Sequence, residues 1–513
     1  MVISHAQILA QLGDTGRVAG TLHPTARSIL FGTVADDAID TDLPWITQVD
    51  RAHLVMMAET GLLPMTQVSP LLRRIDEMEC SGFAVLRGRS APRGVYLLYE
   101  TYLIADLGEE IGGVLQTARS RNDLGATVLR MRLRDVVAGL LTGVMRLQWD
   151  LLRRAERHRD AVFPIYTHYQ PAQPVTLGHY YAGVAAALDR DADALCAVLA
   201  DLDRCPLGAG AVGGTGLPID ARRTAALLGF SAPWTHSIDA VASRDVVLRL
   251  LAALGILGVT VSRLAHDLQL WTSGEFGFLT VADDLVGTSS MMPQKRNVYM
   301  LEHVKGMAAA PIGALTAAAM AMHATPFSNS IAVGTEGVKP VWAAASRMSD
   351  ALSLIRLIVA GAAPNRAAMR RRAVSGQTNA TALADWLVRE CGMPFRRAHH
   401  EVGGVIRAML ERGAIDLEAA AREAHPEWFC NATAPVLDPV EVTAAQEYGG
   451  GPGTESTGRE IERRRTALRA RRAVLAGERR RWRAARRTLQ AAVQGILDIA
   501  VIDRPGRGRP AGA

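Results

Sequence analysis

Residues 287–297 read GTSSMMPQKRN, so two serines, a lysine and an asparagine stand close together just before an apolar pattern. Small and hydroxylated residues, followed by Pro293, predict a loop rather than a helix. From about Tyr299 the apolar residues recur at helical spacing. Hydroxyls and an amine on a mobile segment before a helix suit a lid that carries a base and an anion-binding group. A serine-rich surface turn would have the same composition.

Two upstream stretches also gather polar side chains that can do chemistry. Residues 117–123 read TARSRND, and residues 167–174 read THYQPAQP. Arginine can bind a carboxylate through two parallel hydrogen bonds, which lysine cannot. Histidine can change its charge near neutral pH. The first stretch therefore suits a dicarboxylate ligand, and the second suits proton transfer.

Together and in this order, the three stretches resemble the signature blocks of the fumarase/aspartase superfamily. The MPQK within residues 292–295 is similar to its argininosuccinate lyase branch. Weaker likeness at residues 206–211 and 381–400 extends the resemblance over roughly residues 45–453. It implies an all-α fold whose long central helix bundle assembles into a homotetrameric core. It also implies active sites that are each built from three chains.

Apolar periodicity supports the same architecture independently. Residues repeat at i, i+3, i+4 and i+7 near 123–157, 174–202, 238–271, 298–322 and 337–361, which predicts long helices. Long helices joined by short breaks favour an elongated bundle, and a lone copy would expose much apolar surface. We therefore expect an oligomer.

The same patterns divide the chain into three helical domains and an extension. We expect an N-terminal helical domain over residues 1–115, the central bundle over 116–363 and a small helical domain over 364–453. Residues 454–513 are predicted to be an arginine-rich helical extension, helical over 459–494, with a disordered tail from Asp503.

Composition excludes several other classes of protein. The 513 residues are 49% hydrophobic and 21% charged, which is typical of a soluble globular enzyme. Much of the net charge of +6 falls after Arg459. That run lacks aromatic interleaving apart from Trp482 and has no nucleic-acid motif, so we expect a solvated helix and no nucleic-acid partner. The apolar run from Val246 to Leu270 contains charged residues, which favours a buried bundle helix over a membrane span.

Cysteine usage and the N-terminus indicate the compartment. Five cysteines show no CxxC or Cys/His ligand spacing, which predicts reduced thiols, no zinc site and a cytoplasmic protein. Residues 1–5 show no basic segment followed by a long apolar one, so no signal peptide is expected. Nothing in the sequence indicates a metal, nucleotide or organic cofactor.

The resemblance implies a β-elimination that breaks a carbon–nitrogen bond of an N-substituted aspartate and leaves fumarate. Removing a proton next to a carboxylate builds negative charge, so the site needs a base and fixed positive charge. Ser289 matches the family's base, and Lys295 and Asn297 match the groups that hold the reacting carboxylate. Ser290 is assigned to substrate binding beside them.

The resemblance assigns the remaining site residues to the two upstream stretches. His168 matches a catalytic acid or orienting group and pairs in the family with a glutamate at the position of Glu302. Thr167 is assigned to substrate binding. The rest of the predicted substrate-binding set is Arg119, Ser120, Arg121 and Asn122, among which Arg121 and Asn122 match direct contacts and Arg119 matches a supporting residue.

Several positions depart from the argininosuccinate lyase pattern. The branch has histidine at Gln116, glutamine at Leu124, and proline-aspartate where Val298 and Tyr299 stand. Residues 326–339 read PFSNSIAVGTEGVK and keep no tyrosine, glutamine and lysine set for the arginine portion of the substrate, although Lys339 could partly substitute. The family's tryptophan-glycine-glycine-arginine opening is also missing. Polar groups matched to one substrate make a pocket selective, so these changes predict a different leaving group.

We therefore expect a fumarate-releasing carbon–nitrogen lyase that acts on a small-molecule dicarboxylate with an altered amine. Three alternatives stay open. The protein could be a true argininosuccinate lyase that releases arginine and fumarate, a nitrosuccinate- or aspartate-type lyase, or a catalytically silent structural relative.

Overall fold

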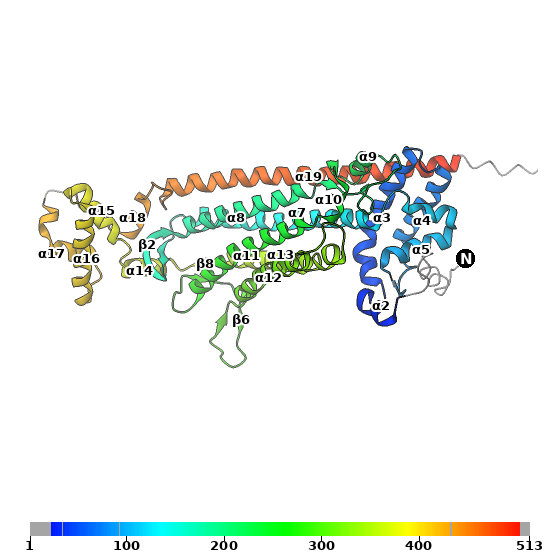
Figure 1. Cartoon of the computed structure of the whole chain (residues 1–513). Coiled ribbons are helices and arrows are strands. Elements are labelled where there is room, and N and C mark those ends of the chain that lie inside the picture. Colours follow the sequence, from blue (N-terminus) through cyan, green and yellow to red (C-terminus); the bar gives the residue numbers. More distant parts are fainter. Residues whose placement is uncertain (1–21, 33, 92, 431–432, 503–513) are drawn as a thin grey trace, which may run out of the picture.

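The computed structural model describes residues 22–32, 34–91, 93–430 and 433–502. Its helices and few short strands confirm the predicted all-α class (Figure 1). The predictions for the first residues and for the tail from Asp503 lie outside the described part of the chain. The division into domains stays a prediction.

The helices have the following bounds. They are α2 Pro24–Phe31, α3 Asp36–Glu59, α4 Met65–Cys80, α5 Val95–Leu107, α6 Glu109–Gly112, α7 Arg121–Arg157, α8 Leu177–Asp201, α9 Ala221–Leu227, α10 Ser237–Ala242, α11 Asp245–Thr272, α12 Met300–Met322, α13 Lys339–Gly361, α14 Arg366–Ser375, α15 Ala380–Cys391, α16 Phe395–Glu411, α17 Leu417–Ala424, α18 Pro439–Ala445 and α19 Thr454–Ile502.

Short turns and paired strands link these helices. The single-turn segments are η1 Gly113–Gln116, η2 Asp283–Leu285, η3 Ala332–Glu336 and η4 Pro426–Phe429. The strand pairs are β1 Val162–Thr167 with β2 Gln170–Thr176, β3 Arg204–Cys205 with β4 Ala232–Pro233, β5 Leu279–Thr280 with β8 Ala363–Pro364, and β6 Gly287–Thr288 with β7 Arg296–Asn297. The pair β3 and β4 is parallel, and the others are antiparallel.

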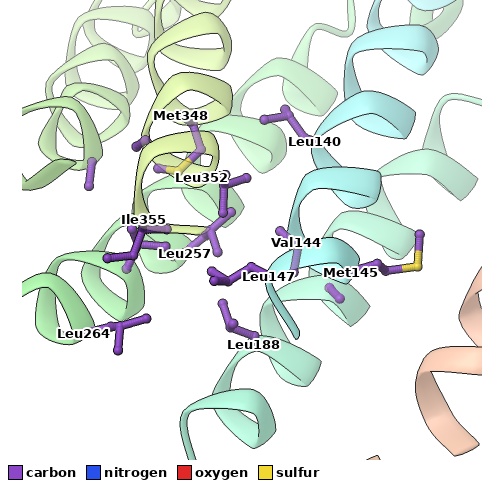
Figure 2. Packing of buried hydrophobic residues seen from close by; sticks show 14 of the residues in the cluster. Leu140, Val144, Met145, Leu147, Leu188, Leu257, Leu264, Met348, Leu352 and Ile355 are labelled. Atoms are coloured by element: carbon purple, nitrogen blue, oxygen red, sulfur yellow. The ribbon is translucent and has the colours of Figure 1, made fainter. Parts of the chain in front are cut away.

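The five helices α7, α8, α11, α12 and α13 run side by side as the central bundle (Figure 1). Leu140, Val144 and Leu147 recur along one face of α7, so this face turns toward the core. Figure 2 shows Leu147 among Leu257 of α11 and Leu352 of α13 in this core. All five helices therefore share one buried hydrophobic cluster.

Two smaller groups of helices lie at opposite ends of the bundle (Figure 1). Helices α3, α4 and α5 build a second hydrophobic cluster at the end where α7 begins. Helices α15, α16 and α17 build a third at the other end. The bundle therefore separates the start of α7 from the small C-terminal group.

Helix α19 corrects the expectation of a solvated arginine-rich helix. Its 49 residues run the length of the bundle, from the small C-terminal group back to the N-terminal helices (Figure 1). Ile461, Leu468 and Leu475 join the bundle cluster, whereas Leu489, Val493 and Ile496 join the N-terminal cluster. This apolar stripe was not recognised in the sequence, because many arginines surround its few apolar residues.

Two predicted helices differ from the structure near their first residues. Residues 170–176 form strand β2 of a hairpin rather than the start of a helix at 174. Pro171 and Pro174 have no N–H to donate within a helix, and edge strands tolerate proline. The helix predicted at 238–271 is broken between α10 and α11, where Ser243 has an extended backbone.

Helices α11 and α12 are, by length and composition, apolar enough to cross a membrane. In α11 most of the apolar stretch is buried inside the bundle, as predicted. In α12 only 22% of that stretch is buried. Ile312 and Met320 of α12, with Ile256 and Val259 of α11, are left exposed. The bundle therefore has an uncovered apolar side.

Candidate functional site

The serine loop, residues 289–295, projects from the side of the bundle beyond β6 (Figure 1). Gly287 pairs with Asn297 and Thr288 with Arg296, so the two short strands close the base of the loop. The guanidinium of Arg296 also bonds the carboxylate of Asp283 and donates to the carbonyl of Val281 at 2.9 Å. The base of the loop is therefore held while its tip stays exposed.

Ser289 lies at the start of this loop with its hydroxyl turned inward. Its Oγ accepts hydrogen bonds from the backbone N–H groups of Met292, at 3.0 Å, and Met291, at 3.3 Å. Two N–H donors stabilise negative charge on an oxygen. These two donors would also stabilise a deprotonated Ser289 oxygen. Ser290 and Lys295 are exposed on the same loop.

Tyr299, which stands at a position where this chain departs from the family pattern, supports the base of the loop. Its ring lies so close to Gly287 that a Cβ there would approach Tyr299 Cδ1 to 2.7 Å. Only glycine at position 287 leaves room for the Tyr299 ring.

Glu302 is exposed in the first turn of α12, where its Oε1 accepts a hydrogen bond from Gln269 at 3.4 Å.

The stretch at residues 117–123, which we call the arginine block, caps the start of α7. The Ser120 hydroxyl accepts from the N–H of Asn122, and the Asp123 carboxylate accepts from the N–H of Ser120, which forms a capping box. The second Asp123 oxygen accepts from Gly208 and Gly210, both at 3.0 Å. The weakly matching stretch 206–211 is thereby fixed against the arginine block.

Arg119 lies beneath this block rather than in an open cavity. It forms an ion pair with Asp50, and neither side chain is exposed. Burial alone would lower the pKa of Arg119. The neighbouring Asp50 and Tyr96 outweigh burial and raise this pKa above its ordinary value. Burial and Arg119 lower the pKa of His53 to about 3, and neutral His53 contacts the carbonyl of Thr117 at 2.8 Å. This placement fits the supporting role expected of Arg119.

Arg121 and Asn122 line a pocket of about 570 Å³ beside the start of α7. The Asn122 amide donates to the Ala211 carbonyl at 3.1 Å and accepts from the Asn329 amide at 3.0 Å. Leu124, another position of departure from the family pattern, lines the same pocket. Arg121 and Asn122 of the predicted dicarboxylate block and the altered position Leu124 therefore share one cavity, which we name the amine-side pocket.

Thr167 and His168 lie at the opposite end of the bundle. They are exposed at the tip of the β1–β2 hairpin, where His168 and Tyr169 both have positive φ. Helix α7 has 37 residues and is therefore about 55 Å long at 1.5 Å per residue. The chain passes along it between Arg121 and the hairpin (Figure 1). One chain does not bring these residues together.

The structure thus groups the predicted site residues in three places. Ser289, Ser290, Lys295 and Asn297 share the serine loop, with Glu302 just beyond it. Ser120, Arg121 and Asn122 lie at the start of α7, and Thr167 and His168 lie at the hairpin tip. Among the described residues, no group of three or more His, Cys, Asp or Glu side chains could hold a metal ion.

Sequence reasoning missed several residues that support these groups. Asp50 and His53 occupy the buried face of α3, at helical spacing from Ile46 and Met57. Charged and polar side chains on an otherwise apolar face signal a buried partner. Asn329 had no comparable signal, because its segment follows neither a helical nor a strand period.

Comparisons with known proteins show which family the chain resembles over most of its length. Residues 100–313 match a family described as Lyase, and residues 377–444 match one described as Argininosuccinate lyase C-terminal. An argininosuccinate lyase from Thermus thermophilus is 38% identical over 410 residues, covering 78% of this chain and 87% of that protein. The crystal structure of EDDS lyase in complex with formate is 30% identical, with a TM-score of 0.81, and covers 94% of this chain and 98% of its own. A variant of EDDS lyase with bound fumarate has a TM-score of 0.80 at 30% identity, covering 95% of this chain and 98% of its own.

Proposed function

Since this chain belongs to the argininosuccinate lyase family, we propose that Ser289 is the base that starts its reaction. The protein is a fumarate-forming carbon–nitrogen lyase that acts on a small dicarboxylate. The observation that carries the proposal is the pair of N–H donors from Met291 and Met292 to the Ser289 hydroxyl oxygen.

In this reaction Ser289 first loses its hydroxyl proton to solvent, and the resulting alkoxide takes a proton from the carbon next to one substrate carboxylate. The electrons of that C–H bond move onto the carboxylate, where Lys295 and Asn297 stabilise the charge. They then return to form the carbon–carbon double bond while the carbon–nitrogen bond breaks. The amine leaves with the bonding pair and gains a proton from His168, which Glu302 orients. Arg121 and Asn122 hold the second carboxylate.

Each active site combines groups from several copies of the chain in a homotetramer. Two observations support this assembly. The hairpin that carries His168 is about 55 Å from Arg121 along α7, so the two cannot meet within one chain. The uncovered apolar side of α11 and α12 also needs a protein partner. A symmetric oligomer satisfies both requirements.

The amine that leaves is not arginine in this proposal. The pocket beside Arg121 and Asn122 is lined by Leu124 and by the segment of Asn329 to Lys339, where the family pattern is lost. True argininosuccinate lyase activity, a nitrosuccinate- or aspartate-type reaction and a catalytically silent relative are the competing readings. The free cysteines fit the expected cytoplasmic location.

Replacing Ser289 tests the proposal. The variant Ser289→Ala should lower kcat with any substrate by about 10²–10⁴-fold, because it removes the base. It should still bind fumarate. The matched control is Ser273→Ala, at the end of α11, whose hydroxyl donates to the carbonyl of Leu270. Turnover by Ser289→Ala close to that of the control would refute Ser289 as the base.

A further inference from the structure

The Asn122 side chain is engaged by two residues that are far from it in sequence. Its amide nitrogen donates to the Ala211 carbonyl at 3.1 Å, and its amide oxygen accepts from the Asn329 amide nitrogen at 3.0 Å. An asparagine amide has two N–H donors and one oxygen acceptor. Within the described part of the chain, these contacts leave the second N–H of Asn122 without a protein partner.

The two contacts set the direction of both amides. The Ala211 backbone carbonyl can only accept, so Asn122 must turn its nitrogen toward it. The Asn122 oxygen then faces Asn329, which must present its own nitrogen. In the opposite orientation two acceptors would meet at Ala211 and two donors at Asn329, which costs the free energy of both bonds. The second N–H of Asn122 is thereby kept as a donor for a ligand of the amine-side pocket, which Asn122 lines.

Asn329 is itself held by the turn that follows it, between α12 and α13. The Ser330 carbonyl accepts from the N–H of Gly334 at 2.8 Å, and the buried Val333 anchors the turn. A Cβ at Gly334 would approach Asn329 Oδ1 to 3.2 Å, so backbone packs closely against this amide. The turn continues into η3, a π-helical segment, and such segments are frequent at functional sites. Asn329 therefore approaches Asn122 from a closed turn.

On the basis of the proposed function, in which Asn122 holds the second substrate carboxylate, we infer that Asn329 is a positioning residue of this reaction. It acts through Asn122 by fixing the direction of that amide before the substrate arrives. A donor that is already oriented binds a carboxylate more tightly than one that must first be ordered. Asn329 lies outside the three stretches that resemble the family's signature blocks.

Fumarate binding, measured by calorimetry, gives a readout that does not need turnover. Asn329→Leu keeps the approximate shape of the side chain but removes the donor, and it should raise the Kd of fumarate by about tenfold. Asn329→Asp places a second acceptor against the Asn122 oxygen and should raise it by about 10–100-fold. The matched control is Thr325→Ala on the same segment, whose hydroxyl donates to the carbonyl of Met322 at 2.8 Å. It should leave the Kd unchanged.

Steady-state kinetics with a substrate that the wild-type enzyme turns over should show the same division. The second carboxylate is held in the ground state and in the transition state alike, so KM should rise with the Kd. The kcat should stay within about threefold of the wild type. A merely structural defect would instead lower the fraction of active enzyme and with it the kcat.

A double-mutant cycle shows whether Asn329 acts through Asn122. Asn122→Ala alone should raise the Kd of fumarate by about 10–100-fold, because it removes a donor to a charged group. Adding Asn329→Leu to this variant should change the Kd by no more than about twofold, since the amide that Asn329 orients is already gone. Effects that multiply in the double variant would overturn the positioning role.

The outcomes separate this inference from the proposed function. If Asn329→Leu binds fumarate as tightly as Thr325→Ala does, the positioning role is refuted, while the lyase reaction and the role of Ser289 stand. If the wild-type protein, as a folded oligomer, does not bind fumarate at all, the proposed function is refuted and the inference with it.

Discussion

Asp50 and Arg119 form an ion pair of 2.6 Å, and neither side chain has any exposed surface. The pair joins α3 to the turn before α7, where Ala118 has a φ of 62°. Tyr96 accepts a further bond from Arg119 at 3.2 Å. This buried contact holds the turn from which Arg121 and Asn122 reach the amine-side pocket.

Breaking this pair should destabilise the protein strongly. Asp50→Asn leaves the Arg119 guanidinium buried without a counter-charge, and such losses cost about 3–5 kcal/mol of unfolding free energy. Urea denaturation followed by circular dichroism measures the change. Asp76→Asn is the control, because Asp76 pairs with Arg51 at a more exposed site and should cost about 1 kcal/mol or less. Equal effects of the two substitutions would contradict a structural role for the buried pair.

The contact between Gly287 and Tyr299 should set the position of the serine loop. In Gly287→Ala the added methyl group would collide with the Tyr299 ring, so the loop base must shift. A displacement of about 1 Å at the base can cost about 10²-fold in kcat. Steady-state kinetics with a substrate that the wild-type enzyme turns over measures this loss.

Two further variants show whether the collision is the cause. Gly274→Ala has no neighbouring atom within 4 Å of the added methyl group and should keep its activity. The double variant Gly287→Ala with Tyr299→Ala should recover much of the kcat, because the ring is removed. If the double variant is as slow as Gly287→Ala, the glycine acts through something other than Tyr299.

Complementation should reveal that active sites are shared between chains. Ser289→Ala and His168→Asn change groups that lie in different places on one chain, so each variant alone should be nearly inactive. Co-expressed, they form mixed oligomers in which some sites combine an intact serine loop with an intact hairpin. Activity clearly above that of either variant is expected. Activity no higher than the two alone would place both residues in a site from one chain.

The long helices of this fold could be predicted from the sequence because their periodicity is strong. The bundle helices at 298–322 and 337–361 match α12 and α13 within about two residues. The hairpin at residues 162–176 could not be predicted, because its strand pairing depends on contacts between neighbouring segments. The buried stripe of α19 was hidden by its many arginines.

The members of the candidate site were easier to predict than their arrangement. The signature stretches name Ser289, Arg121 and His168 directly. The separation of Arg121 from His168 follows from the length of α7. The partners of Asn122 and Arg119 lie far away in sequence, at Asn329 and Asp50. A contact between two side chains that lie far apart in the sequence produces no periodic pattern in either segment, so it could not be predicted.

The last prediction concerns the anchoring of α19 on the bundle. The Asp189 side chain is 6% exposed and accepts bonds from Arg464 at 2.8 Å, Arg471 at 2.9 Å and Gln148 at 2.7 Å. Burial by itself would raise its pKa, but these donors hold the pKa of Asp189 below its ordinary value. Asp189→Asn should therefore lower the unfolding free energy by about 2 kcal/mol or more at pH 7.

The sign of the pH dependence follows from the lowered pKa. A carboxylate whose pKa is depressed by folding stabilises the native state above its unfolded pKa of about 3.9, and this contribution is lost as the pH falls through the folded value. The difference in stability between the wild type and Asp189→Asn should therefore be full at pH 6–7 and shrink below about pH 4. Urea titrations over this range measure it. Asp193→Asn, which removes an exposed partner of Arg471, is the control and should cost about 1 kcal/mol or less. A difference that stays constant down to pH 3 would show that Asp189 anchors α19 through packing rather than through its charge.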